Sequence, residues 1–290
     1  ALDANTTGAY NSAVGSYALS GCITGIYNTA VGAYAMQVST ASYNTAVGYT
    51  GLYVNTTGQH NTAVGNAALL GNTTGSYNVG VGSYALDANT TGQYNTALGY
   101  GSLSANTTAN SNTAIGEQAL NVNYHGSNNT AVGKSALAAN TTADNNVAVG
   151  INSLKVNTTG EKNVAVGTNA LDANIGASYN TALGHVALTE NTTGNKNTAV
   201  GKGALSANTT ASNNTAVGYH SLDLNTGQNN TAVGANAMRD ATTGNDGIAI
   251  GSFAMGDGTW TGNTCVAIGN SSLSNATSAY QDVAVGTYAL

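Results

Sequence analysis

The fold is decided by a short repeated stretch, Asn-Thr-Ala-Val-Gly, which stands at residues 61–65. Its glycine returns at intervals of 17 residues, with two intervals of 16 and one of 18, and seventeen copies fill the 290-residue chain. The glycines that close the copies are Gly15, Gly32, Gly48, Gly65, Gly82, Gly99, Gly116, Gly133, Gly150, Gly167, Gly184, Gly201, Gly218, Gly234, Gly251, Gly269 and Gly286. No linker or change of composition interrupts them, so we predict one repeat array over residues 1–290. Because solenoids carry distinct capping units and this array starts and ends inside a repeat, we expect a fragment of a longer fibrous protein.

The residues around each glycine follow fixed rules. The residue directly before it is always Val, Ile or Leu, and the residue two before it is Ala in every copy except Gly80. Three before it the residue is Thr, Val or Ile except at Ser12, and four after it stands Leu or Met, as at Leu19 and Met36. The β-branched stretch favours a short strand. No stripe of apolar residues at helical spacing survives across the repeat, so we exclude a helix.

The repeat therefore predicts an all-β fold, a parallel β-solenoid or β-roll of about seventeen coils of 17 residues. We expect the Thr-Ala-Val strand to be followed by a glycine turn, a second short strand around Ala-Leu, and an Asn-Thr-Thr-Gly corner. Side chains alternate between the two faces of a strand, so the Ala and Val columns face opposite ways. Both columns are apolar, and only one can face the inside of a coil. The outer apolar face predicts a side-by-side homo-oligomer.

Composition sets further limits on function. The chain has 38 Gly, no Pro, 1 Trp and 1 Phe, so it cannot build a large aromatic core, and its interior must be thin. With 6 Lys+Arg and a net charge of −6, it lacks a basic surface that could follow nucleic-acid phosphates. No apolar run approaches the length of about 18 residues that spans a bilayer. We therefore expect neither nucleic acid as a partner nor membrane insertion by this segment.

Asparagine forms two further columns. One lies four residues before the glycine in 14 of 17 copies, and the other begins the Asn-Thr-Thr corner in 12 of 17. Stacked amides can hydrogen-bond from coil to coil and satisfy the backbone of turns, so we predict a structural asparagine ladder. Its representative members are Asn55, Asn72, Asn89 and Asn106. The alternative is that Asn-Thr-Thr is an N-glycosylation sequon, although acceptors stacked about 4.8 Å apart could not all carry glycans.

Taken together, Asn-Thr-Ala-Val-Gly, a small residue and Leu resemble the Ser-Val-Ala-Ile-Gly repeat in the heads of trimeric autotransporter (YadA-like) adhesins. Closely similar Asn-Thr-Ala-Val-Gly arrays occur in phage and large-virus tail-fibre-like proteins. The resemblance covers the whole chain. It implies a left-handed parallel β-roll, three chains assembled side by side, attachment to surfaces, and a location outside the cell, on a cell surface or on a virion. The family's repeat is shorter, however, and lacks the Asn-Thr-Thr-Gly corner.

Residues capable of catalysis or metal binding are scattered. The four histidines lie in different coils, and none shares a column with an acid at the spacing of a zinc site or a catalytic triad. They are His60, His125, His185 and His220. The acids lack the Gly-Gly-x-Gly-x-Asp repeat that binds calcium in other β-rolls. We therefore predict that the chain is not an enzyme and has no catalytic residues, no cofactor and no metal site.

Tyrosine is unevenly distributed. Eleven of the 16 tyrosines lie in the first 100 residues, and the first 116 residues carry only Asp3 and Asp87 as charges. A tyrosine ring suits stacking on a neutral glycan or on another protein. The predicted ligand contacts are three tyrosines that share the second place after the glycine, with two others in reserve: Tyr17, Tyr34, Tyr84, Tyr27 and Tyr43. The alternative interpretation is that these rings only cover turns between strands.

The hypothesis for function that follows is a structural and adhesive segment of an extracellular or virion-associated fibre. Its expected partners are two further copies of itself, in a homotrimer, and a surface glycan or a cell-wall or host receptor. An ice-binding or other water-ordering solenoid is the alternative, because threonine columns spaced about 4.8 Å apart could order water. A polysaccharide-processing enzyme is a weaker third possibility, because the chain lacks paired carboxylates.

Overall fold

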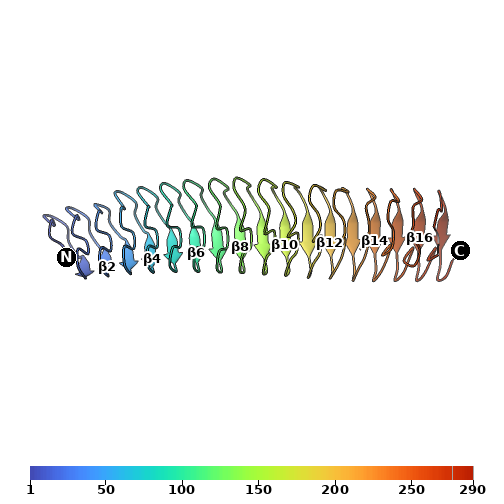
Figure 1. The fold of residues 1–290 in the computed structure, drawn as a ribbon, viewed down its shortest axis with the longest axis horizontal. Coiled ribbons are helices and arrows are strands. Elements are labelled where there is room, and N and C mark those ends of the chain that lie inside the picture. The colour runs from blue at the N-terminus through green and yellow to red at the C-terminus, as the bar shows by residue number, and fades with distance from the viewer. Residues whose placement is uncertain (276, 290) are drawn as a thin grey trace. The chain divides into compact units, whose positions relative to one another are not determined.

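A computed structural model describes residues 1–275 and 277–289. It divides into two compact units, Ala1–Asn145 and Asn146–Leu290. In each unit the chain winds through coils that contain one three-residue strand apiece, and the strands of successive coils lie side by side (Figure 1). No helix occurs among the described residues. These features confirm the predicted all-β parallel β-solenoid with coils of about 17 residues.

The strands follow one another in chain order. The first unit contains β1 (Ser12–Val14), β2 (Thr29–Val31), β3 (Thr45–Val47), β4 (Thr62–Val64), β5 (Val79–Val81), β6 (Thr96–Leu98), β7 (Thr113–Ile115) and β8 (Thr130–Val132). The second contains β9 (Val147–Val149), β10 (Val164–Val166), β11 (Thr181–Leu183), β12 (Thr198–Val200), β13 (Thr215–Val217), β14 (Thr231–Val233), β15 (Ile248–Ile250), β16 (Val266–Ile268) and β17 (Val283–Val285). Within each unit, consecutive strands pair in parallel and in register, so equivalent residues of successive repeats form columns.

The interior of each coil is built from alanine and leucine. In the coil that contains β4, Ala63 and Leu69 are both completely buried. Gly80, which replaces the strand alanine in β5, shows how little space remains: a Cβ added there would lie 3.3 Å from Leu69 Cγ and 3.2 Å from the Ala85 carbonyl oxygen. The strand column therefore takes alanine because the leucine column already fills the coil.

The segment around Ala-Leu is a turn, so the expectation of a second strand there is wrong. The leucine or methionine of this column has a positive φ in every described coil, for example 50° at Leu19 and 52° at Leu69. An extended strand cannot continue through such a residue. The conformation is held by burial of the side chain and by a hydrogen bond between coils, in which Leu69 N–H donates to Ala85 O at 2.9 Å.

The asparagines four residues before the glycine are buried in all but the first of the coils that carry one, and they connect one coil to the next. The Asn78 backbone N–H donates to Asn61 Oδ1 at 2.9 Å, and Asn95 N–H donates in turn to Asn78 Oδ1 at 3.0 Å. The Asn78 side-chain amide donates to Gly92 O at 2.8 Å in the corner of the following coil. The amide thus satisfies backbone groups that a strand of three residues cannot pair.

The corner asparagines form a second buried column of hydrogen bonds. Asn72 Nδ2 donates to Asn55 Oδ1 at 3.0 Å, Asn89 Nδ2 to Asn72 Oδ1 at 2.7 Å, and Asn106 Nδ2 to Asn89 Oδ1 at 2.8 Å. Each of these amides also donates to a carbonyl of its own corner, as Asn72 does to Gly75 O. All four side chains are completely buried. A glycan on any of them would displace these hydrogen bonds in the folded coil.

Candidate functional site

The outer face of each strand presents two parallel columns. The outer apolar column consists of the Val, Ile or Leu directly before each glycine, and all its members are exposed or half-buried, with Val47 37% exposed. The threonine column lies two residues earlier and is half-buried in most coils, as at Thr45 and Thr62. The buried alanine between them points the opposite way, because side chains alternate along a strand. The solenoid therefore carries an ordered, half-apolar surface.

The three tyrosines predicted as ligand contacts do not form a continuous surface. Tyr17 and Tyr34 stack with their ring centroids 5.3 Å apart. Thr50 and Ala67 occupy the same column in the next two coils, so Tyr84 is separated from that pair. Tyr84 instead makes an edge contact with Tyr100, centroid to centroid 6.0 Å. All three predicted contacts are exposed, but the structure brings only two of them together.

The two reserve tyrosines, Tyr27 and Tyr43, belong to a different column, five residues before the glycine. Together with their neighbours they form a continuous stack of six rings, which we call the aromatic ladder. Its members, in order, are Tyr10, Tyr27, Tyr43, His60, Tyr77 and Tyr94. Successive ring centroids are 4.9, 5.4, 5.0, 5.0 and 5.1 Å apart. The ladder was not predicted, although the constant offset of its members from the glycine is a signal present in the sequence.

The histidines have unrelated environments. His60 lies inside the aromatic ladder, between Tyr43 and Tyr77. His125 Nδ1 is 3.1 Å from Thr108 Oγ1. His220 Nδ1 is 2.6 Å from Asp223 Oδ2, and the two residues are only three apart in the chain, in different columns. His185 lies on the exposed side of its coil.

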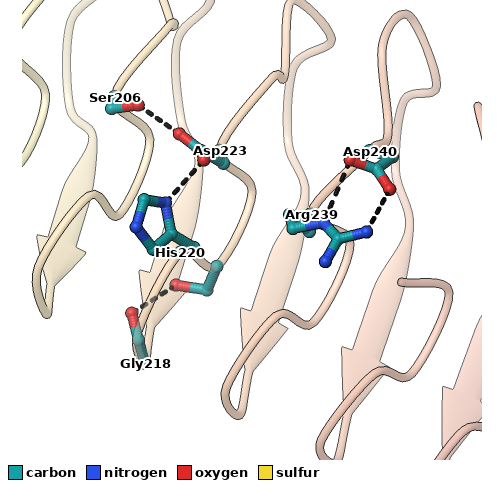
Figure 2. A network of polar contacts seen from close by, with 7 residues as sticks. Ser206, Gly218, His220, Asp223, Arg239 and Asp240 are labelled. Carbon is teal, nitrogen blue, oxygen red and sulfur yellow. Dashed lines mark hydrogen bonds and ion pairs between the residues drawn. The ribbon is translucent and has the colours of Figure 1, made fainter. Parts of the chain in front are cut away.

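The His220–Asp223 pair belongs to a polar network in the second unit (Figure 2). The Ser206 hydroxyl, one coil earlier, donates to Asp223 Oδ1, and the Ser221 hydroxyl donates to Gly218 O at 3.1 Å. The arrangement places a base beside an orienting carboxylate, as in hydrolase triads. The serine, however, is bound to the carboxylate and not to the imidazole. As described, the network links neighbouring coils and does not activate a nucleophile.

Three other kinds of site are absent from the described residues. No group of three His, Cys, Asp or Glu side chains is close enough to hold a metal ion. No pocket forms on the surface of the described part of the chain. Residues 1–275 and 277–289 contain no helix with the length and hydropathy to cross a membrane.

Cys22 and Cys265 are buried free thiols, and burial raises the pKa of Cys22.

Asp87 provides a prediction about pH. Burial raises the pKa of its carboxyl, and Oδ1 is enclosed without a hydrogen-bond partner among the described residues. A carboxyl whose pKa is higher in the folded state favours folding below its unfolded pKa of about 3.9, and this stabilisation is lost as pH rises through the folded value. Asp87→Asn should therefore raise the urea midpoint at pH 7 and change it little at pH 3.5.

Asn121 occupies the same place two coils later, where its amide donates to Gly101 O and Ser104 Oγ, so the column accepts asparagine. Asp3→Asn is the control, because the Asp3 side chain is 64% exposed. An equal gain from both substitutions, or a gain at Asp87 that persists at pH 3.5, would contradict the role assigned to burial.

A scan of the chain against protein-family models finds no match, and a comparison with curated proteins finds none either.

Proposed function

We propose that this chain is a structural and adhesive segment of an extracellular or virion-associated fibre, in which three copies pack side by side. The observation that carries the proposal is the outer apolar column. Its Val, Ile and Leu side chains stay exposed or half-buried in every described coil, whereas the alanines that alternate with them are buried. A regular apolar stripe of this kind is typical of a surface that another chain covers.

Side-by-side assembly also fits the geometry of the strands. Each unit repeats one coil in register, so a contact that forms at one coil can form again at the next. Burying apolar surface contributes about 25 cal/mol per Å², so each coil adds a modest free energy of association. These contributions add up because the same contact repeats along the array. The resemblance to the heads of trimeric adhesins supports three as the number of chains and a left-handed coil. Both remain part of the proposal.

The experiment that tests assembly is a mass measurement by light scattering on the purified chain. We expect three times the chain mass of 28.7 kDa. The triple variant Val31→Thr, Val47→Thr and Leu98→Thr should dissociate the assembly while each coil stays folded, since threonine is also common in strands. The matched control exchanges the neighbouring column, with Thr29→Val, Thr45→Val and Thr96→Val, and should remain assembled. A monodisperse monomer of the native chain would overturn the proposal of a trimer.

Attachment is tested separately, by cosedimentation of the labelled chain with insoluble cell-wall preparations. Binding that survives washing and increases with the amount of wall material is the expected result. A chain that stays in the supernatant with every preparation contradicts the adhesive part of the proposal and leaves the fibre part standing.

Ordering of water is a second candidate function, and one observation favours it. The threonine and outer apolar columns lie side by side on the strand face, so Thr45 and Val47 belong to an array two columns wide. If this face stays uncovered and orders water, the purified chain should be a monomer by mass and should show thermal hysteresis. A trimer without thermal hysteresis excludes this candidate.

A further inference from the structure

The aromatic ladder is the most regular feature of the first unit that the proposed assembly does not use. Its rings are nearly coplanar, with angles of 4 to 13° between successive ring planes. The ladder is also well exposed: Tyr10 is 77% exposed and Tyr43 is 44% exposed. Every ladder residue has a positive φ, and most are also held by a backbone hydrogen bond between coils, such as Tyr43 N–H to Ile26 O at 3.0 Å.

The fold itself does not require rings in this column. The same place is taken by Ser111, Asn128 and Asn145 later in the first unit, with φ values of 58 to 61°. In the second unit it is mainly polar, and Lys162 Nζ lies 5.1 Å from the centroid of the next ring, Tyr179. Asparagine adopts positive φ more readily than tyrosine does. Rings in six successive coils therefore need an explanation other than backbone geometry.

Stacking determines what the ladder can offer a ligand. Each inner ring has both faces against its neighbours, so the exposed part of each inner tyrosine is its edge with the phenol hydroxyl. No hydrogen bond within the described residues occupies the hydroxyls of the five ladder tyrosines. The result is a row of donors and acceptors that repeats about once per coil.

The surroundings favour an uncharged and hydroxyl-rich ligand. The threonine column of the same coils lies two residues along the chain from the ladder and is half-buried, as at Thr29 and Thr62. Only Asp3 and Asp87 carry charge in the first 116 residues. An ionic ligand would lose hydration there without gaining an ion pair. A neutral ligand with regularly spaced hydroxyls suffers no such loss.

We propose that the aromatic ladder binds an extended, neutral β-linked polysaccharide that lies along it, with successive sugars following successive rings. Such a chain advances by the length of one pyranose per residue, which is comparable to the spacing of 4.9 to 5.4 Å between rings. Its hydroxyls can form hydrogen bonds with the tyrosine and threonine hydroxyls along the row. This inference rests on the proposed adhesive function and names its ligand class and its contacts.

The test uses the full chain with cellulose and chitin powders in cosedimentation, and with soluble β-glucan oligosaccharides in calorimetry. The native chain should bind the powders, and a hexasaccharide should bind more tightly than a trisaccharide because it spans more rings. The ladder variant combines Tyr27→Asn, Tyr43→Asn and Tyr77→Asn. It should weaken hexasaccharide binding by about tenfold or more.

A matched control exists in the column after the glycine, with Tyr17→Asn, Tyr34→Asn and Tyr84→Asn. Both triples introduce a residue that its own column already carries, at Asn128 in the first and at Asn152 in the second, so both should keep their melting temperature. The control should keep its affinity within about twofold. A third variant, with Tyr27→Phe, Tyr43→Phe and Tyr77→Phe, retains the stack and removes hydroxyls. It should also lose affinity, which separates hydrogen bonding from ring packing.

Several outcomes would overturn the inference. Undiminished binding in the ladder variant, or loss only in the control, would place the contacts elsewhere. A change of oligomeric mass in the ladder variant would identify the ladder as a contact between copies of the chain. Failure of the native chain to bind cellulose, chitin or the oligosaccharides, combined with binding to cell-wall preparations, refutes this inference alone. Failure in both assays refutes the adhesive function as well.

Discussion

Gly99→Ala should strongly destabilise the first unit, although it adds only one methyl group. Gly99 has a φ of 137°, which residues with a side chain rarely adopt. A Cβ there would lie 2.6 Å from Gly116 O and 2.7 Å from Gly116 C in the next coil, and a backbone fixed by parallel pairing cannot easily retreat. We expect the free energy of unfolding to fall by about 3 kcal/mol, from backbone strain and steric collision together. Urea unfolding followed by circular dichroism measures it.

The control lies two residues away. Gly101 also has a positive φ, 59°, but the nearest atom to an added Cβ is Asn121 Nδ2 at 3.4 Å. The same column carries Ala67 with a φ of 55°, so alanine fits there. Gly101→Ala should cost about 1 kcal/mol or less. If both substitutions lower the free energy of unfolding equally, the close approach of successive coils at Gly99 is not the cause of the loss.

The sequence predicted the features that depend on one residue type in every repeat. A column that accepts only glycine, as at Gly99, indicates a forbidden φ or a close backbone approach, and both are present. The alanine column predicted a thin interior, and Ala63 is completely buried. Buried asparagine columns followed from the need to satisfy turn backbone in a coil with little regular pairing.

Other features depend on how neighbouring coils pack, and residue preferences within one repeat did not predict them. Leu69 has no intrinsic preference for positive φ, so Ala-Leu was interpreted as a strand, yet burial and the bond to Ala85 hold it in a turn. The aromatic ladder was overlooked because the tyrosines were grouped by the column after the glycine. His60 has the same offset from its glycine, but a search by tyrosine alone misses it, and its stacking between Tyr43 and Tyr77 places it in the ladder.

Ala131→Leu in β8 or Ala165→Leu in β10 should overpack its coil. Both alanines are completely buried in the centre of their strands. The buried alanines of the other strands show that the column holds one methyl group, and the contact distances at Gly80 show that the leucine column begins directly beyond it. Three additional carbon atoms must displace the buried leucine or push the neighbouring coils apart. We expect a cost of about 1–3 kcal/mol for each substitution, measured as a shift of the urea midpoint.

Two substitutions serve as controls for this prediction. Lys134→Leu adds an apolar side chain on the surface and removes only an exposed ion pair, Nζ to Glu117 Oε2 at 3.0 Å, so it should be nearly neutral. Gly80→Ala restores the residue that the other strands carry. It should change the free energy of unfolding by about 1 kcal/mol at most, because the lower entropy of the unfolded chain offsets the close contacts of the new Cβ with Leu69 and Ala85. If Ala131→Leu shifts the urea midpoint no more than Lys134→Leu does, the interior has more space than the contact distances around Gly80 indicate. In that case the small size of the strand column must have a cause other than packing.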